Sequence, residues 1–355
     1  MALPKIPFFR KYSIFFKAVI VGGILGLLYG IVTDTSSIYD HLGFLPAIVI
    51  GIAIGFIVIV FENGIKLNQY PFLLVMLLKA VVYGISIFIL LILFMTGFTE
   101  LSGKHIYKEG LIMYAHNRLA GDFFFSLGAS VFLILFLEVS SLLSSRFFYN
   151  YFTGRYHRPV QEERIFMFVD VKSSTTIAEE LGDIQYSQLL QDLFNDFTDG
   201  ILASHAEIYQ YAGDEIILTW KTAQGLKARR CLYCFYLLKE IIHAKKEYYL
   251  QTYNLVPKFK AGMHMGTAVT AWVGKIKKEI VYHGDLLNTT ARIQSTCNEL
   301  EHDFVISEAI KQNLHDDPDI TYNLKGEILL RGKAQPLKLF TVDFNLEESK
   351  NAAEN

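Results

Sequence analysis

Residues 164–170 read RIFMFVD, and residues 206–220 read AEIYQYAGDEIILTW. The first stretch is a short apolar and aromatic run that ends in Asp170, which predicts a strand with an acid at its carboxyl end. The second reads as two strands around a tight turn at Ala212-Gly213-Asp214. We therefore expect one carboxylate at the end of a strand and a second at the tip of a hairpin.

Two carboxylates on neighbouring strand ends form a suitable site for divalent cations. Mg²⁺ prefers oxygen ligands and usually takes one or two carboxylates together with substrate phosphates. A pair of such ions can activate an attacking oxygen and stabilise a leaving one. Each acid also has an ordinary explanation, since Asp170 precedes a Ser/Thr run typical of a loop or helix cap, and Asp214 follows a turn glycine. Both interpretations stay open on these two residues alone.

The wider sequence resembles the class III adenylyl and guanylyl cyclases over roughly residues 164–344. FVDVKSST at 168–175 is similar to the first metal motif of that family, and YAGDEIILTW at 211–220 is similar to the second. The remaining motifs follow in the family's order, as FKAGMHMGTAV at 259–269, YHGDLLNTTARI at 282–293 and LRGKAQPLKLFTV at 330–342. Five motifs in one order are far more specific than any one of them.

The resemblance implies a nucleotidyl cyclase that uses two Mg²⁺ or Mn²⁺ ions per site. The metal ligands that it implies are Asp170, Val171 and Asp214. The substrate-binding residues that it implies are Ser174 and Thr175, Asn288 on the ribose, Arg292 on the phosphate as charge builds, and Lys333 on the triphosphate.

Asn288 and Arg292 are four residues apart in NTTAR, so both side chains point from one face of a helix. A guanidinium fork suits phosphate oxygens better than a point charge does. Taken alone, NTTAR is also typical of an ordinary polar helix face. In the family, the two aspartates come from one subunit and the Asn and Arg from the other. Because this chain carries both halves, the resemblance implies a head-to-tail homodimer with two shared sites.

The two positions that read the base depart from the family's pattern. In the family, Lys with Asp or Thr goes with adenine, and Glu with Cys or a small residue goes with guanine. Here the positions hold Gln210 and Val281, which fit neither pair. An amide carries both a donor and an acceptor, so Gln210 can suit either base. We expect the substrate to be ATP, converted to 3′,5′-cyclic AMP and pyrophosphate, because ATP is the commoner substrate among family members of bacterial type. GTP is the alternative substrate.

Two further functions compete with this one. AGDE resembles the GGDEF motif of diguanylate cyclases, although that family lacks counterparts of NTTAR and LRGK. A degenerate cyclase domain that binds nucleotide as a receptor output is the non-enzyme alternative. Loss of a metal aspartate would indicate degeneracy, whereas Asp170 and Asp214 are both present.

Residues 1–145 are dominated by long apolar runs, which predicts a membrane domain of four helices. The expected spans are at about 13–32, 44–61, 72–95 and 123–143. Basic residues favour the cytoplasm for both termini and for the catalytic domain, although three basic residues in the loop 97–121 make this bias moderate. We therefore expect a multi-pass protein of the inner (plasma) membrane, with the lipid bilayer as a partner.

Lys79 and Glu138 are charged residues inside the third and fourth expected spans. Each lies about two turns from the cytoplasmic end of its helix, so both are expected at the same depth. An ion pair between the two spans is one interpretation. Snorkelling of the Lys79 ammonium toward the lipid headgroups is the other.

The 355 residues have room for two domains. We expect a four-helix transmembrane domain at 1–145, a juxtamembrane linker at 146–162, a catalytic domain at 163–345 and a disordered tail at 346–355. The catalytic domain is expected to be α+β, with a ferredoxin-like split βαβ core. Its predicted elements include a strand at 165–169, a helical pattern at 223–249, and a strand, turn and strand at 258–273. Between the first two, Leu189, Leu193, Phe197 and Ile201 are four residues apart, which predicts one apolar face of a helix.

Composition and cysteine usage exclude two classes of site. The formal net charge of −2 offers no basic footprint for nucleic acid. Cys231 and Cys234 form a CxxC, but no second CxxC or nearby His pair completes a zinc site. They are therefore interpreted as small buried thiols in a helix.

Overall fold

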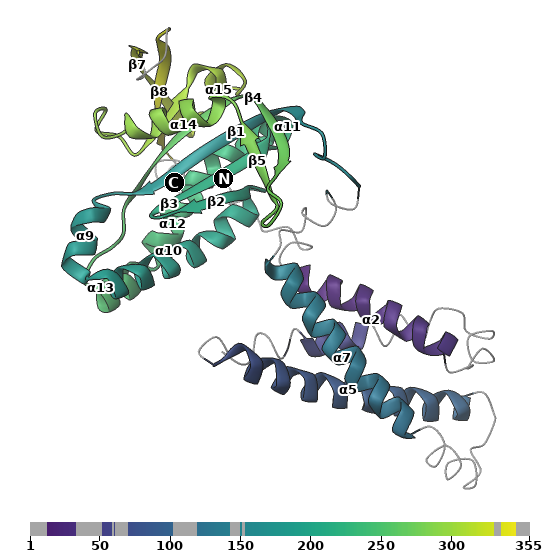
Figure 1. Cartoon of the computed structure of the whole chain (residues 1–355). Helices are drawn as coiled ribbons and strands as arrows, with labels where there is room; N and C mark the ends of the chain where they lie inside the picture. Colours follow the sequence, from purple (N-terminus) through teal and green to yellow (C-terminus); the bar gives the residue numbers. More distant parts are fainter. Residues whose placement is uncertain are drawn as a thin grey trace, which may run out of the picture. The chain divides into compact units, whose positions relative to one another are not determined.

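The computed structural model describes residues 13–32, 52–58, 60, 70–101, 119–142, 150, 153–329 and 335–345. The chain divides into two compact units, with the boundary between Thr153 and Gly154 (Figure 1). Each unit has its own apolar core.

The N-terminal unit is built from apolar helices. These are α2 (Ser13–Val32), α5 (Phe72–Leu101) and α7 (Leu119–Leu142), with a further helical stretch at 52–58. Among the described residues, two segments are long and apolar enough to cross a membrane, Phe72–Leu90 and Ala120–Ser140, with mean hydropathies of 2.5 and 2.1. In α2 the apolar segment is the shorter Phe15–Leu28. The four predicted spans therefore stay a prediction, since much of the second lies outside the described residues.

Of the two interpretations of Lys79 and Glu138, the structure supports the ion pair. Lys79 Nζ lies 3.1 Å from Glu138 Oε1, and the lysine side chain is only 9% exposed, so it points into the unit instead of snorkelling. Two residues further along α7, Ser140 accepts a hydrogen bond of 3.2 Å from Lys17 Nζ of α2. Polar contacts thus join the end of α7 to both α2 and α5.

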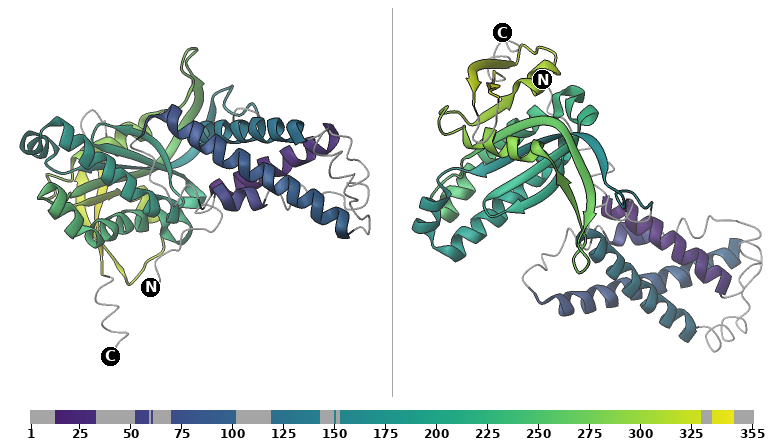
Figure 2. Two further views of the ribbon diagram at one scale, coloured as in Figure 1. Left: turned by 90° about the horizontal axis from the view of Figure 1, so that it is seen from below. Right: turned by 45° about the horizontal axis from the view of Figure 1, so that its top comes forward.

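The C-terminal unit contains an eight-stranded mixed sheet. Its order is β2-β3-β1-β4-β6-β8-β7, with β5 paired to β4. The strands are β1 (Val160–Val171), β2 (Glu207–Ala212), β3 (Glu215–Lys221), β4 (Phe259–Val273), β5 (Glu279–His283), β6 (Phe304–Ser307), β7 (Ile320–Ile328) and β8 (Leu337–Phe344). Figure 2 shows β4 and β5 as a long green hairpin extending from the sheet. The order β2-β3-β1-β4 is the predicted split βαβ core.

Helices cover both faces of this sheet (Figure 1). They are α9 (Ser174–Leu181), α10 (Asp183–Ala203), α11 (Thr222–Leu226), α12 (Arg230–Ala244), α13 (Lys246–Tyr253), α14 (Asp285–Ser295) and α15 (Glu308–Gln312). Alternate residues of a strand face opposite sides, so Ile165, Met167 and Val169 join the main core with α10 and α12. Phe166 and Phe168 face the other way, toward α14.

The predicted apolar face of α10 is confirmed, since Leu189, Leu193, Phe197 and Ile201 are all buried. The interpretation of the cysteines is also confirmed, because Cys231, Cys234 and Cys297 are buried free thiols. Burial raises the pKa of each of these thiols to about 12.

Three sequence predictions differ from the structure. Residues 259–273 form one strand without a turn, because β4 pairs with β1 in unbroken register from Val160 to Val171. The helical pattern at 223–249 is broken, because Ala228 and Arg229 have positive φ angles of 52° and 51°. β1 begins at Val160, inside the stretch expected to be linker.

A buried charge cluster holds the start of β1. The Arg164 side chain is 2% exposed and lies 3.1 Å from Glu162 and 3.4 Å from Glu207. Arg155 approaches the other oxygen of Glu162 at 2.6 Å. Burial raises the pKa of Glu162, but hydrogen-bond donors and guanidinium charge around it outweigh burial and hold its pKa below the ordinary value.

Both strands at the ends of the main order contain a bulge. The register between β2 and β3 shifts between Ile208 and Gln210. The register between β7 and β8 shifts between Leu324 and Gly326, where glycine adopts a φ of +99°.

Candidate active site

Three neighbouring strands bring charged side chains together at the end of β1. Asp170 pairs with Glu215 of β3 on one side and with Lys260 of β4 on the other. Residues directly opposite each other in an antiparallel pair share a face. All three side chains therefore lie on the α14 side of the sheet, in one row.

Asp170 is held by two donors. Gln294 Nε2 of α14 donates a hydrogen bond of 2.8 Å to Asp170 Oδ2, and Lys260 Nζ lies 3.3 Å from the same oxygen. Lys260 also donates to Asn298 Oδ1 at 3.1 Å, so its ammonium is fixed on two sides.

Asp214 lies beside this row because the hairpin tip folds against β1. The turn is permitted by Gly213, whose φ is +66°. The backbone N–H of Val171 donates to the carbonyl oxygen of Asp214 at 3.4 Å. The structure therefore brings the three predicted metal ligands, Asp170, Val171 and Asp214, into one small region.

The carboxylates in this region repel one another. Burial, and then the negative charge of Asp214, raises the pKa of Asp170 above its ordinary value, while Lys260 opposes the rise. Burial and the charges of Asp170 and Asp214 raise the pKa of Glu215 to about 7. A divalent cation would relieve this repulsion, so the donor set fits Mg²⁺ or Mn²⁺.

The protein supplies only part of a coordination sphere. Within the described part of the chain, no cluster of three or more His, Cys, Asp or Glu side chains is arranged to hold a metal ion. Backbone carbonyls, water and substrate phosphates would have to complete it, which is usual for Mg²⁺.

The segment after Asp170 turns at once into a helix. Ser173 has a φ of +56°, and α9 starts at Ser174. Ser174 is half-buried, Thr175 is exposed, and the Ser174 side chain is hydrogen-bonded to Tyr186. Burial, and then the charge of Asp214, raises the pKa of Tyr186, so this phenol lies close to the acids. The predicted residues Ser174 and Thr175 are thus at a helix N-terminus next to the metal ligands.

Asn288 and Arg292 lie on α14 as predicted, one exposed and one half-buried. No ion pair or side-chain hydrogen bond joins either of them to another residue in the described ranges. They make no such contact with Asp170 or Asp214 of their own chain.

The two predicted base readers lie next to an aromatic contact. The rings of Tyr209 and Tyr282 meet with centroids 5.1 Å apart, which brings β2 and β5 together. Gln210 follows the bulge and pairs with Ile217, whose side chain packs in the cluster on the α14 side. Gln210 is exposed on that side, whereas Val281 alternates with Tyr282 and faces away from the cluster. The remaining predicted site residue, Lys333, lies outside the described residues.

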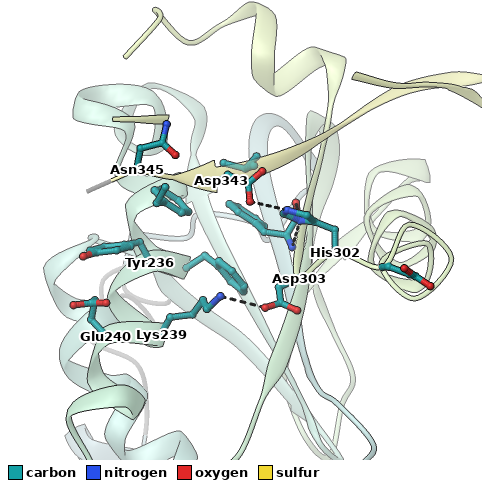
Figure 3. Close-up of a pocket in the computed structure, with 12 residues that line it drawn as sticks. Tyr236, Lys239, Glu240, His302, Asp303, Asp343 and Asn345 are labelled. Atoms are coloured by element: carbon teal, nitrogen blue, oxygen red, sulfur yellow. Dashed lines mark hydrogen bonds and ion pairs between the residues drawn. The ribbon is translucent and has the colours of Figure 1, made fainter. Parts of the chain in front are cut away.

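The structure also contains a cavity of about 530 Å³ elsewhere in the C-terminal unit. Figure 3 shows its aromatic floor with a charged rim that includes Lys239, His302, Asp303 and Asp343. The rim is internally paired, with 3.1 Å between Lys239 and Asp303 and 2.9 Å between His302 and Asp343. None of the predicted site residues lines it.

Sequence reasoning missed four residues near the acids: Glu215, Lys260, Gln294 and Tyr186. Glu215 and Lys260 stand inside recognised motifs, and strand pairing would have placed both beside Asp170. Nothing in the sequence points to Gln294, because its role depends on how α14 packs on the sheet.

The chain is similar to several known cyclases. Adenylate cyclase 2 of Rhizobium meliloti (strain 1021) is 34% identical over 218 residues, 61% of this chain and 60% of that protein. Adenylate cyclase 1 of the same strain is 24% identical over 187 residues, 51% of this chain and 28% of that protein. The adenylyl cyclase CyaB from P. aeruginosa superposes with a TM-score of 0.45 and 17% identity, over 52% of this chain and 96% of that one. The chain thus spans less than two thirds of the length of both curated relatives.

A family model of the adenylate and guanylate cyclase catalytic domain matches residues 158–343. That range is more than half of the 355 residues and contains the whole acid row together with α14. The chain therefore belongs to the adenylate and guanylate cyclase catalytic-domain family.

Proposed function

We propose that this chain is a membrane-anchored class III nucleotidyl cyclase that converts ATP to 3′,5′-cyclic AMP and pyrophosphate. The observation that carries the proposal is the crowding of Asp170, Asp214 and Glu215 around one lysine, in a chain that belongs to the cyclase family. The choice of ATP is supported by the relative named adenylate cyclase at 34% identity.

The reaction joins the 3′-oxygen of the nucleotide to its own α-phosphorus. The bond between that phosphorus and the bridging oxygen breaks, pyrophosphate leaves, and the proton of the 3′-hydroxyl passes to solvent. Asp170, Asp214 and the backbone of Val171 would hold two Mg²⁺ or Mn²⁺ ions. When bound, these ions supply activation of the 3′-oxygen and stabilisation of the leaving group.

The other residues bind and orient the nucleotide. The N-terminus of α9, at Ser174 and Thr175, offers backbone N–H groups to phosphate oxygens. Lys260 and Lys333 add positive charge for the triphosphate. Arg292 has no ionic partner in the described part of its own chain, and its guanidinium fork suits the developing charge at phosphorus. Asn288 orients the ribose from the same face of α14.

We infer that each site is shared between two copies of the chain. Asn288 and Arg292 are available on α14 while the acids lie at the end of β1, and this separation supports a head-to-tail homodimer with two composite sites. Segments of α5 and α7 are long and apolar enough to span a lipid bilayer, which supports anchoring in the inner (plasma) membrane. The moderate bias of basic residues supports a cytoplasmic catalytic domain.

A nucleotide panel tests the reaction. The full chain, purified in detergent, is incubated with ATP, GTP, CTP or UTP and with Mg²⁺ or Mn²⁺, and the products are identified by mass. Cyclic AMP is the expected main product, and Asp170→Ala and Asp214→Ala should be folded but nearly inactive. Asp199→Ala, an exposed acid on α10, is the matched control and should keep full activity. Absence of any cyclic mononucleotide would overturn the proposal, and a cyclic dinucleotide would indicate a diguanylate cyclase.

Co-expression tests the shared site. Asp214→Ala and Arg292→Ala should each be inactive alone. With random pairing, half of the dimers are mixed and each mixed dimer has one intact site, so about a quarter of wild-type activity should return. No recovery, with mixed dimers shown by affinity tags, would count against sharing.

A further inference from the structure

We propose that Gln294 positions the metal-binding Asp170 of its own chain, so that one helix, α14, serves both active sites of the dimer. This inference rests on the proposed cyclase function and on the shared sites. It assigns a task to a residue that lies two positions from Arg292 yet acts on the opposite site.

The two faces of α14 differ in what they present. Asn288 and Arg292 are four residues apart and share the outer face, with Asn288 exposed and Arg292 half-buried. Gln294 comes two residues after Arg292, about 200° further around the helix. Its side chain is accordingly directed inward, and the residue is 7% exposed.

On the inner face, Gln294 makes a specific contact with a metal ligand. Its Nε2 donates to Asp170 Oδ2 at 2.8 Å, and Lys260 approaches that same oxygen at 3.3 Å. Within the described ranges, no hydrogen bond or ion pair reaches Oδ1. The amide therefore fixes the rotation of the carboxylate and leaves Oδ1 available to a divalent cation. Residues behind metal ligands commonly set their orientation in this way.

The position of Gln294 is itself fixed by the sheet. A Cβ at Gly262 of β4 would lie 2.2 Å from the Gln294 nitrogen, so helix and strand backbones are in direct contact there. The next residue before it, Ile293, is fully buried in a separate apolar cluster with Val305 and Leu339. The inner face of α14 thus cannot slide without moving Gln294 away from Asp170.

This packing has a consequence in a head-to-tail dimer. The outer face of α14 supplies Asn288 and Arg292 to the site that uses the partner's aspartates. The inner face orients Asp170 for the chain's own site. A shift of α14 when nucleotide binds at one site is therefore transmitted to the metal ligand of the other.

Metal binding tests the contact without relying on turnover. Gln294→Leu removes the amide donor at similar volume, and Gln294→Met is the second variant if the first does not fold. Free Mn²⁺ is followed by electron paramagnetic resonance during titration of the dialysed full chain. The expected result is about tenfold weaker Mn²⁺ binding, with no change for Arg292→Ala or for the exposed neighbour Ser295→Ala. Unchanged Mn²⁺ affinity in Gln294→Leu, or no Mn²⁺ binding by the wild type, would overturn the proposal.

Steady-state rates separate positioning from general damage. Gln294→Leu should raise the KM for Mn²⁺ while largely retaining kcat at saturating Mn²⁺, and Ser295→Ala should change neither. A fall in kcat with an unchanged KM for Mn²⁺ would contradict a positioning role.

Complementation tests whether Gln294 acts with the metal-binding aspartates or with Arg292. The assay uses a Mn²⁺ concentration far below the raised KM of Gln294→Leu, where this variant alone has little activity. Under that condition Gln294→Leu co-expressed with Arg292→Ala should recover activity, because one site then combines a sound Asp170 with a sound Arg292. Gln294→Leu with Asp214→Ala should not recover, because both metal half-sites are then impaired. The reverse pattern would place Gln294 with Arg292 and overturn the inference. If Asp214→Ala with Arg292→Ala also fails to recover while Mn²⁺ binding weakens as expected, shared sites are refuted but the contact with Asp170 stands.

Discussion

Replacing Gly262 with alanine should push α14 off the sheet. The added Cβ would lie 2.2 Å from Gln294 N and 2.5 Å from Gln294 Cα, and both are backbone atoms that no rotamer change can move. Ordinary van der Waals contacts begin at 3.4 Å. The helix must therefore withdraw by about 1.2 Å, the difference between 3.4 and 2.2 Å.

The size of the effect follows from this overlap. Forcing an extra methyl group into a packed interior typically costs about 1–3 kcal/mol. For a domain of 150–250 residues this corresponds to a fall in Tm of about 2–12 °C. The same withdrawal displaces Gln294 from Asp170 and moves Arg292, and a misplacement of about 1 Å can cost on the order of 100-fold in rate.

Gly266→Ala is the matched control on the same strand and the same face. There the nearest atom to a new Cβ is Leu286 Cδ1 at 3.7 Å, an ordinary contact. We expect unchanged activity and a stability equal to wild type or higher by about 0.4–1 kcal/mol. Thermal unfolding and cyclase rates of both full-length variants in one detergent give the comparison. If Gly262→Ala melts and turns over like Gly266→Ala, the close packing of α14 on β4 is refuted.

Three further predictions concern other parts of the chain. Gln210→Glu should move kcat/KM from ATP toward GTP, because a carboxylate accepts from guanine N1–H and repels adenine N1; an unchanged ratio would place the base reader elsewhere. Lys79→Glu combined with Glu138→Lys should give a higher yield of monodisperse protein than either single change, since each single change places two like charges side by side among apolar helices; a double variant no better than the singles would contradict this. Glu162→Gln should lower stability by about 1–3 kcal/mol at pH 7, because the buried Arg164 loses a charged partner. Because the pKa of Glu162 is lowered in the native state, this difference should be full above the ordinary glutamate pKa and should vanish as pH falls through the lowered one. Melting curves of both proteins at pH 7 and at acid pH measure it, and a gap that persists in acid would refute the assignment.

Local pattern was sufficient to predict the hairpin and several helix faces. The alternation around Gly213 predicts β2 and β3 because a turn residue with positive φ separates two apolar runs. The fourfold spacing from Leu189 to Ile201 predicts α10 because one stripe must be buried. For Lys79 and Glu138, their depth made pairing one of two interpretations, and only the packed helices decide between an ion pair and snorkelling.

Features that depend on tertiary contact could not be predicted in this way. A turn was expected inside 258–273, but the stretch is one strand, and its Gly262 allows α14 to approach β4. Neither Ala228 nor Arg229, which have the positive φ angles, is a residue type that marks a helix break; the nearest glycine is Gly225, three residues earlier. The hydrogen bond from Gln294 to Asp170 joins residues that are distant in sequence, and only the packed sheet brings them together.

The bulges in β2 and β7 bear on how the protein avoids aggregation. Both strands lie at the ends of the main sheet order, where a row of N–H and C=O groups would otherwise be available to another molecule. An extra residue near Tyr209 in β2 and near Lys325 in β7 interrupts that row and increases the local twist. Regular strand addition along either edge is thereby discouraged, which keeps the folded sheet from serving as a template for fibril-like growth. Two copies of the chain then associate through side-chain contacts, which can be selective, and not through backbone hydrogen bonds along a strand edge.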